Sequence, residues 1–264
     1  MKTIGLLGGM SWESSRICYR IINEEVARRL GGLHSARSVM YSFNFQEIEA
    51  LQHVGAWDVA TKRLIEGAQS IEVAGADLLL ICTNTMHMMA DEIQEHISIP
   101  LIHIADATAE RIRDRGLRRI GLLGTRFSME MDFYKGRLRD LYGIDVLVPG
   151  PRDREIVDRI IHEELCKGRI RHSSRTFYKR IMEALVADGG EGLILGCTEI
   201  TLLVSQDDAS VPVFDTTRIH AETAVDLALD HEAFSDEGVP SIRGARDGPH
   251  EHIHIHRVTG GMAS

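Results

Sequence analysis

The chain contains four cysteines, whose thiols are candidates for acid–base or nucleophilic chemistry. No two of them form a CxxC pair, so their spacing does not predict a zinc site. In a chain that we expect in the cytoplasm, they do not predict a disulfide framework either. Each thiol should therefore either pack in the core or react. The four are Cys18, Cys82, Cys166 and Cys197.

Two of these cysteines lie in short polar turns that directly follow apolar, strand-like runs. The chain has four such turns, and ligands of open α/β sheets bind beyond the carboxyl ends of the strands. If two lobes face each other, all four turns converge on one cleft. Gly8 and Gly9 let the backbone approach a ligand closely, although their turn lacks the full GxGxxG spacing of a dinucleotide site. The turns comprise residues 8–11, 82–85, 124–128 and 197–199.

The elements that must position these turns alternate along the chain. Apolar β-type runs follow amphipathic helical patterns, which is typical of an α/β protein with a mostly parallel sheet. In the first half we expect strands at 4–7, 38–42, 78–81 and 101–104, and helices over 12–30, 56–74 and 87–96. In the second half we expect strands at 120–123, 144–148, 193–195 and 211–214, and helices near 129–141, 153–166 and 173–188.

Part of this pattern is repeated literally. The IGLLG of residues 4–8 recurs at 120–124, and the Ser-Ile-Pro of 98–100 recurs as Ser-Val-Pro at 210–212. One match would be an ordinary first strand, but several in order favour two similar α/β lobes related by a pseudo-twofold axis. We expect residues 1–99 plus about 209–232 in the first lobe, 100–208 in the second, and 233–264 as a C-terminal tail of unassigned role.

Composition limits the classes of function. The 264 residues carry a formal net charge of −9, with 44% hydrophobic and 26% charged residues, which is globular composition. The negative charge argues against nucleic acid as a partner, because neutralising phosphates needs clustered Lys and Arg. No apolar run approaches the roughly 20 residues of a bilayer span, and the N-terminal run is too short and Gly-broken for a signal peptide. We expect a cytoplasmic protein without a membrane partner.

Four histidines alternate near the C-terminus, which on a strand would place them on one face. Metal ligands usually come with acidic or second-shell partners from elsewhere in the fold. We therefore favour a solvated or partner-packed tail and predict no metal site. The histidines are His250, His252, His254 and His256.

With these motifs in order, the chain resembles the aspartate/glutamate racemase superfamily, and most of all its aspartate racemase branch, over roughly residues 1–230. The Gly-Cys-Thr-Glu form of the last turn is similar to aspartate racemases, whereas glutamate racemases usually continue Gly-Cys-Thr-His. The likeness implies two Rossmann-like lobes with a cleft between them, no cofactor, a small amino-acid substrate and a homodimer. The residues that carry it are 5–11, 83–87, 124–125 with 128–130, and 196–199.

One position departs from the family pattern, which reads Cys-Asn-Thr-x-His. Here Thr83 stands in the first cysteine's place, and Cys82 directly precedes it. Adjacent strand residues point to opposite faces, so the two side chains cannot both face the cleft without a kink. The repeat permits either residue to pair with Cys197, but the motif that continues into Asn84 and Thr85 favours Thr83. We expect Cys82 to pack behind the strand.

The resemblance implies that one thiol removes the α-proton of the substrate and a group on the opposite face returns a proton. A thiolate is a usable base only if its pKa falls from about 8.5, and helix N-termini lower it. We therefore expect a Cys197 thiolate that abstracts the proton and a Thr83 hydroxyl that returns it. Because a hydroxyl is a poor base, such an enzyme is faster with one enantiomer.

Other residues of the motifs should bind the substrate. Thr198 is expected at the carboxylate or ammonium group, although its type also suits helix N-capping. Glu199 could contact the ammonium group or tune Cys197, and His87 is more consistent with a structural role. Lys167 is a candidate for the side-chain carboxylate, and no arginine of the family's kind occurs at 44–50. The remaining candidates are Met10, Ser11, Gln46, Asn84, Thr85, Thr125 and Ser128.

Two other functions compete with racemisation of aspartate or glutamate. Superfamily relatives that decarboxylate malonates or isomerise maleate keep one cysteine in this cleft, and a Thr/Cys pair suits such chemistry. A degenerate member that binds amino acids without turning them over is the other alternative. The intact Gly-Cys-Thr-Glu turn at 196–199 argues against that binder.

Overall fold

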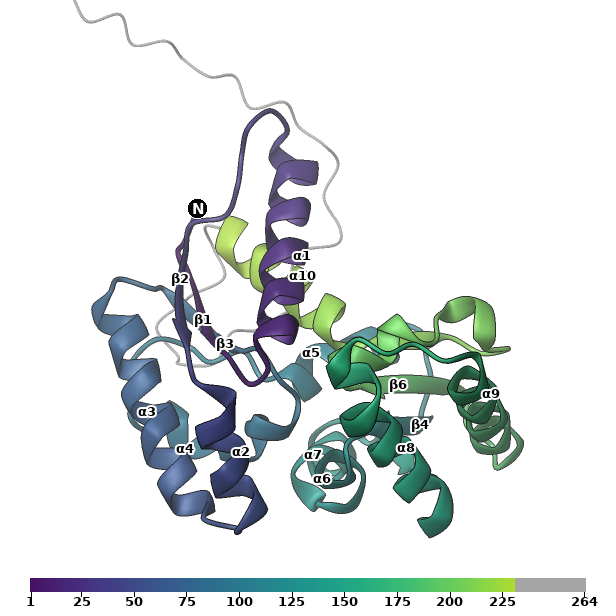
Figure 1. Ribbon diagram of the computed structural model, residues 1–264. Coiled ribbons are helices and arrows are strands. Elements are labelled where there is room, and N and C mark those ends of the chain that lie inside the picture. The colour runs from purple at the N-terminus through teal and green to yellow at the C-terminus, as the bar shows by residue number, and fades with distance from the viewer. Residues whose placement is uncertain (231–264) are drawn as a thin grey trace, which may run out of the picture.

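The computed structural model describes residues 1–230, which form two lobes that are each built on a parallel sheet (Figure 1). The first sheet has the strand order β2-β1-β3 and the second β5-β4-β6-β7, with every pairing parallel. The expected α/β class with two lobes is therefore confirmed. The strands are β1 (Ile4–Gly8), β2 (Ser38–Ser42), β3 (Leu78–Ile81), β4 (Arg119–Gly124), β5 (Asp145–Leu147), β6 (Gly192–Gly196) and β7 (Val213–Asp215).

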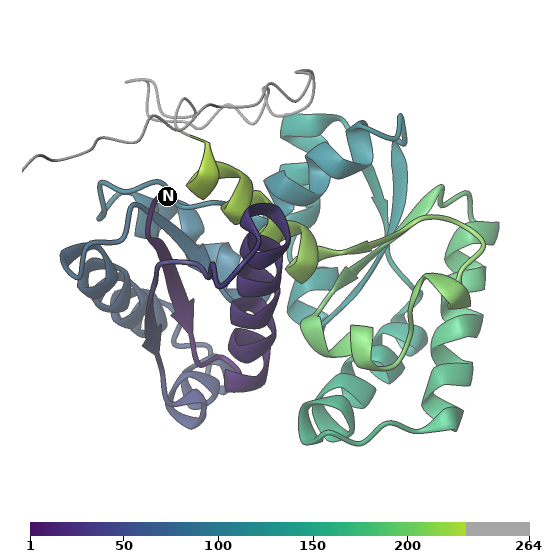
Figure 2. The same ribbon diagram turned by 90° about the horizontal axis from the view of Figure 1, so that it is seen from above.

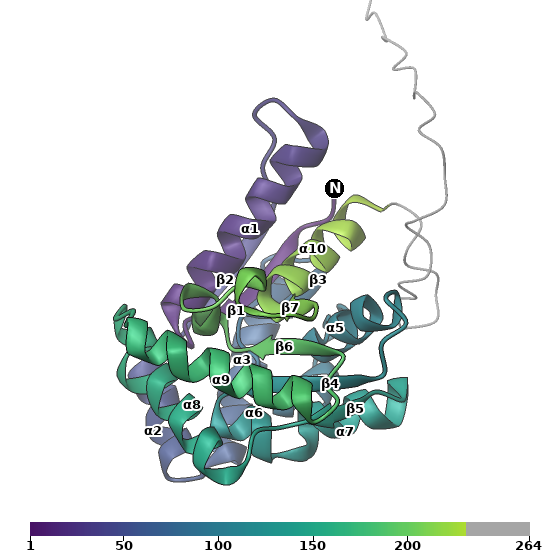
Figure 3. The ribbon, with the colours of Figure 1, turned by 90° about the vertical axis from the view of Figure 1, so that its right-hand side faces the viewer.

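Helices cover both faces of each sheet (Figures 2 and 3). On the first sheet, α1 (Trp12–Leu30) and α10 (Thr216–Leu229) lie over one face, and α3 (Trp57–Val73) lies over the other. On the second sheet, α8 (Pro151–Glu163) and α9 (His172–Ala187) face α5 (Ile104–Arg113) and α7 (Asp132–Tyr142) across the strands. The shorter helices are α2 (Phe45–His53), η1 (Thr85–Met89), α4 (Ala90–Gln94), α6 (Arg126–Glu130), η2 (Leu165–Lys167), η3 (Thr198–Leu202) and η4 (Gln206–Asp208).

Strand alternation decides which side of a sheet each residue meets. Along β3, Leu78 and Leu80 pack with the core under α1 and α10, whereas Leu79 and Ile81 pack with the core under α3. The alternation continues past the end of the strand, so Cys82 joins the α1 and α10 side. All four named residues of β3 are fully buried, as expected for a strand covered on both faces.

The two lobes repeat the same local pairing. β1 lies between β2 and β3 just as β4 lies between β5 and β6. The Leu79 N–H donates to the Pro100 carbonyl at 2.9 Å, and the Leu193 N–H donates to the Pro212 carbonyl at the same distance. The duplicated Ser-Ile/Val-Pro motifs therefore occupy matching places at the sheet edges.

Two strand expectations need correction. Residues 101–104 do not form a strand: Leu101 makes one isolated bridge to Leu79, and α5 begins at Ile104. We also expected residues from about 209 onward in the first lobe, but β7 pairs with β6 in the second sheet. The chain returns to the first lobe only with α10, whose apolar face packs against α1. The strand joins the free edge of β6, because an edge strand offers unpaired N–H and C=O groups.

Helix α2 was not predicted from the sequence. Only Ile48 of its nine residues is fully buried, so its apolar pattern is weak. It begins after Asn44, whose side chain caps the Gln46 N–H at 3.3 Å. Among residues 1–230, none of the helices has the length and apolar character needed to cross a bilayer. The alternating histidines at 250–256 lie outside the described residues.

Candidate active site

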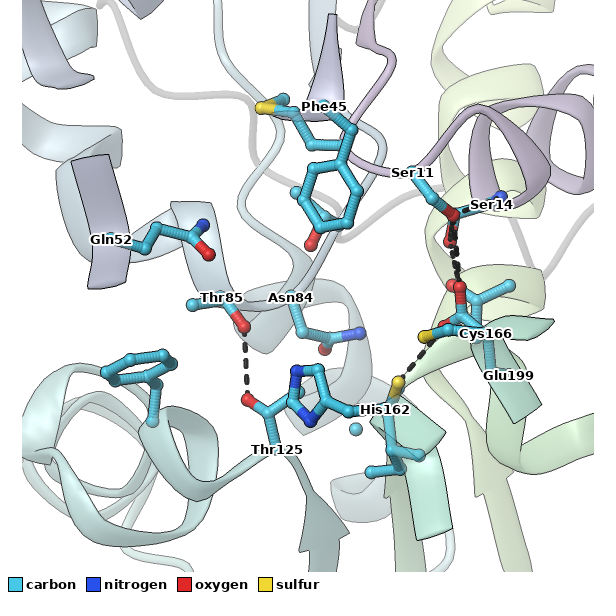
Figure 4. Close-up of a pocket in the computed structure, with 17 residues that line it drawn as sticks. Ser11, Ser14, Phe45, Gln52, Asn84, Thr85, Thr125, His162, Cys166 and Glu199 are labelled. Carbon is cyan, nitrogen blue, oxygen red and sulfur yellow. Dashed lines mark hydrogen bonds between the residues drawn. The ribbon is translucent and has the colours of Figure 1, made fainter. Parts of the chain in front are cut away.

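The four polar turns meet in one pocket at the junction of the lobes (Figure 4). Each turn follows the carboxyl end of a strand: β1 and β3 in the first lobe, β4 and β6 in the second. The polar and thiol side chains in the lining belong to Ser11, Ser14, Gln52, Thr83, Asn84, Thr85, Thr125, His162, Cys166, Cys197, Thr198 and Glu199, and the rest of the lining is Met10, Phe45, Phe127, Ile161 and Gly196.

Cys197 is held by a hydrogen-bonded network that spans both lobes. Its Sγ–H donates to Glu199 Oε2 at 3.0 Å. The other carboxylate oxygen of Glu199 accepts from Ser14 Oγ at 2.9 Å and from Ser11 Oγ at 3.2 Å. Ser11 caps the N-terminus of α1, so the network ties the thiol of the second lobe to the first helix of the other lobe. Glu199 thus contacts Cys197 directly, one of the two roles expected for it.

The electrostatics around Cys197 differ from the sequence expectation. Burial raises the pKa of the Cys197 thiol well above its ordinary value, and the nearby negative charge of Glu199 raises it further. The expected lowering of the Cys197 pKa by a helix N-terminus is therefore wrong. The following helix η3 is a single short 3₁₀ segment, whereas the Glu199 carboxylate lies in hydrogen-bond contact. Cys197 is therefore a neutral thiol that already donates its proton toward a carboxylate.

Thr83 and Cys82 are separated by the strand alternation described above. Thr83 lines the pocket, whereas Cys82 is 6% exposed and packs in the apolar core with Cys18. A hydrogen bond with Cys18 and burial raise the pKa of the Cys82 thiol well above its ordinary value. Cys82 is consequently an inert, protonated side chain.

Several other predicted residues lie in the lining but are already hydrogen-bonded within the protein. Thr85 Oγ1 and Thr125 Oγ1 lie 3.1 Å apart and connect the two lobes across the pocket. Thr198 Oγ1 lies 2.8 Å from Thr217 Oγ1 of α10. Asn84 Nδ2 donates to a threonine of α10 at 3.1 Å, while its buried Oδ1 has no hydrogen-bond partner in the described part of the chain. Asn84 therefore keeps a free acceptor.

Three predicted substrate binders lie outside the lining. Ser128 is fully buried, and its N–H and Oγ contact the Thr125 hydroxyl, so it supports that residue from behind. Gln46 is exposed in the first turn of α2, where its amide reaches Glu49. Lys167 is exposed on η2. The errors at Gln46 and Lys167 share one cause, because the direction of a helical side chain depends on a helix phase that the motif does not reveal.

The residues that the sequence reasoning missed are neighbours of these. Gln52, six positions after Gln46 on α2, lines the pocket and donates to Met86 Sδ at 3.7 Å. Cys166 lines it in place of Lys167, and His162 lies four positions earlier on the same segment. Two chemically capable side chains at i and i+4 are a signal that could have identified this wall. Ser14 follows Ser11 by three residues at the start of α1.

Three histidines pack behind the Thr83 turn. The His87 ring centroid lies 4.8 Å from that of His103 and 5.4 Å from that of His220. His87 Nδ1 lies 2.8 Å from the Thr83 carbonyl oxygen, so the histidine supports the turn. Within residues 1–230, no cluster of His, Cys, Asp or Glu side chains has an arrangement that could hold a metal ion.

Comparison with known proteins places this geometry in a family. The model of the Asp/Glu/Hydantoin racemase family matches residues 7–224. A Yersinia pestis protein assigned to the Asp/Glu racemases is 55% identical, with a TM-score of 0.83 over 87% of this chain and 100% of that one. An aspartate racemase homologue from Pyrococcus horikoshii OT3 is 37% identical, with a TM-score of 0.76 over the same shares.

A curated relative supports the same assignment. The broad specificity amino-acid racemase RacX of Bacillus subtilis (strain 168) is 23% identical over 179 residues, which cover 67% of this chain and 75% of that protein. The family match spans both lobes and all the strands except the first residues of β1. It confirms the resemblance seen in the motifs: the chain belongs to the Asp/Glu/Hydantoin racemase family.

Proposed function

We propose that this protein is a cofactor-independent racemase of aspartate or glutamate that uses Cys197 and Thr83. One observation carries the proposal: these two side chains come from different lobes and line the same pocket, whereas Cys82 is buried elsewhere. A racemase needs two proton-transfer groups around one carbon, and two lobes that close on a pocket supply them.

The contacts of Cys197 suggest how its thiolate forms. The Sγ–H proton moves along the existing hydrogen bond to Glu199 Oε2, which leaves a thiolate beside a protonated carboxyl group. The thiolate then takes the α-proton of the substrate and becomes a thiol again. The Thr83 hydroxyl gives its proton to the opposite face of the carbanion. Water carries the proton of Glu199 back to the threonine oxygen, so the cycle ends with every group restored.

The two directions of the reaction are unequal in this scheme. Starting at Cys197 requires only a thiolate next to a carboxylate acceptor. Starting at Thr83 requires a threonine alkoxide, which is a far less accessible base in water. The proposal therefore predicts faster turnover of the enantiomer whose α-hydrogen faces Cys197.

The remaining lining suits a small amino acid. The free Oδ1 of Asn84 is an acceptor for an ammonium group. The Ser11 and Thr85 hydroxyls border the same space and can donate to a carboxylate. No pyridoxal phosphate takes part in this scheme. General acid–base groups on both faces of the α-carbon remove and return its proton.

The test is α-hydrogen exchange in deuterated water with L- and D-aspartate and L- and D-glutamate. Cys197→Ser should slow exchange by about 100-fold or more, since positioned acid–base groups contribute on that scale. Cys82→Ala is the matched control and should retain exchange, because that thiol lies outside the pocket. Circular dichroism confirms that both variants fold.

Other outcomes would contradict the proposal. Retained exchange in Cys197→Ser refutes the role of that thiol, and loss of exchange in folded Cys82→Ala shows that the wrong neighbour was assigned. Release of carbon dioxide from a malonate without α-exchange of amino acids would support decarboxylation instead. Binding of aspartate with no exchange over hours would support a binding protein.

A further inference from the structure

The charges in the pocket lining are few. Among the described lining residues there is no lysine or arginine, and Glu199 is the one carboxylate. An acidic amino acid carries two carboxylates and one ammonium group, and a positively charged partner binds the second carboxylate more strongly than a neutral donor does. His162 is the one side chain of this lining that can carry a positive charge.

The contacts of His162 orient its ring. It lies on the last turns of α8, where Nδ1 is 2.9 Å from the carbonyl oxygen and 3.5 Å from Oδ1 of Asp158, one helical turn earlier. Asp158 is itself fixed, because its Oδ1 accepts the Arg126 backbone N–H at 2.7 Å. With Nδ1 engaged at Asp158, Nε2 is the nitrogen left for a ligand, and Figure 4 shows the imidazole projecting into the pocket.

The surroundings of His162 favour its protonated form. The hydrogen bond with Asp158 raises the pKa of His162, partial burial opposes this, and the charge of Glu199 adds to the rise. A carboxylate ligand that arrives at Nε2 would favour the imidazolium further. The titratable and charged groups around the His162–Asp158 pair are Arg126, Cys166, Tyr178, Cys197 and Glu199.

We propose that the His162 imidazolium binds the side-chain carboxylate of the substrate through Nε2–H and so selects acidic amino acids. The inference rests on the proposed racemase function and adds the residue that determines its specificity. It assigns the role expected for Lys167, which lies outside the lining, to His162, five residues earlier at the end of α8. His162 is a binding residue in this proposal and takes no part in proton transfer.

The first test measures binding without turnover. Succinate has two carboxylates at the spacing of aspartate, and succinamate replaces one of them by a neutral amide. By calorimetry at pH 6.5, the protein should bind succinate more tightly than succinamate. His162→Gln should weaken succinate binding by about 10-fold, which is the scale of a charge-assisted hydrogen bond, and leave succinamate binding unchanged. His162→Lys keeps a cation and should restore the preference.

His96→Gln is the matched control. The His96 Nδ1 lies 2.8 Å from the carbonyl oxygen of Glu92, four residues earlier, which repeats the local contact of His162. Both rings are exposed to solvent, but His96 lies outside the pocket. The control variant should bind both ligands as the unmodified protein does.

The second readout is the pH dependence of the preference. The ratio of succinate to succinamate affinity should fall as pH rises through the pKa of His162, because the imidazolium loses its charge. In His162→Lys the ratio should stay constant over pH 6 to 8.5, since lysine ordinarily keeps its charge in that range. Using a ratio removes the contributions of Cys166, Cys197 and Glu199, which affect both ligands.

Each other outcome overturns the inference. If His162→Gln weakens the binding of succinate and of succinamate equally, His162 only shapes the pocket. If neither affinity falls, His162 does not contact the ligand. Absence of a preference for succinate in the unmodified protein would exclude a cationic subsite. These results are independent of α-hydrogen exchange, so exchange that fails while the succinate preference holds refutes the racemase and not the subsite.

For the active enzyme the same variant separates binding from chemistry. His162→Gln should raise the KM of aspartate about 10-fold and change kcat little, because the contact is made equally in the ground and transition states. A fall in kcat at constant KM would instead place His162 in the proton transfers and contradict the proposal.

Discussion

At the scale of single residues, the proposed proton transfers depend on the pair formed by Cys197 and Glu199. Burial is the largest cause that raises the pKa of the thiol, and the Glu199 carboxylate adds to it while accepting the Sγ–H proton. The carboxylate therefore has two opposed effects. It disfavours a thiolate in the resting pocket, and in the proposed cycle it is the acceptor through which a thiolate forms.

Replacing Glu199 with glutamine separates these effects. Glu199→Gln removes the negative charge, so the pKa of Cys197 should fall and its alkylation by iodoacetamide should begin at lower pH. The α-hydrogen exchange should nevertheless slow by about 100-fold, because the proton acceptor is lost. Mass spectrometry of the Cys197 peptide follows the alkylation and distinguishes it from the exposed Cys166.

The unmodified protein, titrated in parallel, is the reference for this variant. If the pH dependence of alkylation does not change, the Glu199 carboxylate does not raise the pKa of the Cys197 thiol. Exchange at the original rate would show that the proton leaves Cys197 by another route. Either result would remove Glu199 from the proposed cycle.

At the scale of elements, the turn between β1 and α1 brings two backbone segments into close contact. Gly9 has φ of 87°, and a Cβ at this position would collide with the backbone of Phe43. Its N–H donates to Ser15 Oγ at 2.8 Å, and the Phe43 N–H donates to the Gly8 carbonyl at 3.0 Å. This contact sets the entry into α2, whose first residue, Phe45, lines the pocket.

Gly9→Ala should lower the free energy of unfolding by about 3 kcal/mol or more, since it combines left-handed strain with a backbone clash. Gly143→Ala is the control, because Gly143 has φ of 66° but no atom within 4 Å of the point that a Cβ would occupy. It should cost only the strain, about 1 kcal/mol. Urea unfolding measures both, and equal losses would show that the Phe43 contact relaxes freely.

At the scale of the whole molecule, the lobes are joined where the chain crosses between them. α5 leaves the edge of the first sheet and packs on the second, α10 leaves β7 and packs on the first, and the two helices contact each other. His103 caps α5 by accepting the Ala105 N–H at 3.1 Å, and His220 of α10 lies 2.7 Å from the Ile102 carbonyl oxygen. Two buried histidines thus connect α5 and α10 where the chain passes between the lobes.

This junction should make stability depend on pH. Burial lowers the pKa of His220 to about 4, so between its unfolded value of about 6.5 and pH 4 the unfolded chain binds the extra proton. The contribution of His220 to the free energy of unfolding is therefore fully present above about pH 6.5 and is lost as pH decreases toward 4. His220→Gln should flatten the fall between pH 6.5 and 4.5. The charged groups that face the cluster are Asp106, which opposes the shift of His220, and Arg137, which adds to that of His103.

Urea midpoints from pH 7.5 to 4.5 measure this effect. His96→Gln, on the surface, should keep the slope of the unmodified protein. Parallel slopes for His220→Gln and the unmodified protein would contradict a role of His220 in acid sensitivity, whatever the absolute stability of the variant.

Local patterns were enough to predict much of this molecule. The helix over 12–30 and the strands at 38–42 and 78–81 occur within the predicted limits, because apolar alternation and the flanking turn residues are local properties. The four turns that line the pocket follow directly from where those strands end. The position of Cys82 on the face opposite to Thr83 also follows from the sequence, because side chains alternate between the two faces along a strand.

The sequence alone therefore determined the α/β class, the racemase family, and the turns that would meet. Tertiary structure decided the rest, because it depends on contacts between distant segments. Glu199 meets Ser14 across 185 residues, β7 joins the second sheet, and helix phase brings His162 rather than Lys167 into the lining. Periodicity within an element shows which faces are apolar, but only packing of the lobes against each other shows what those faces meet.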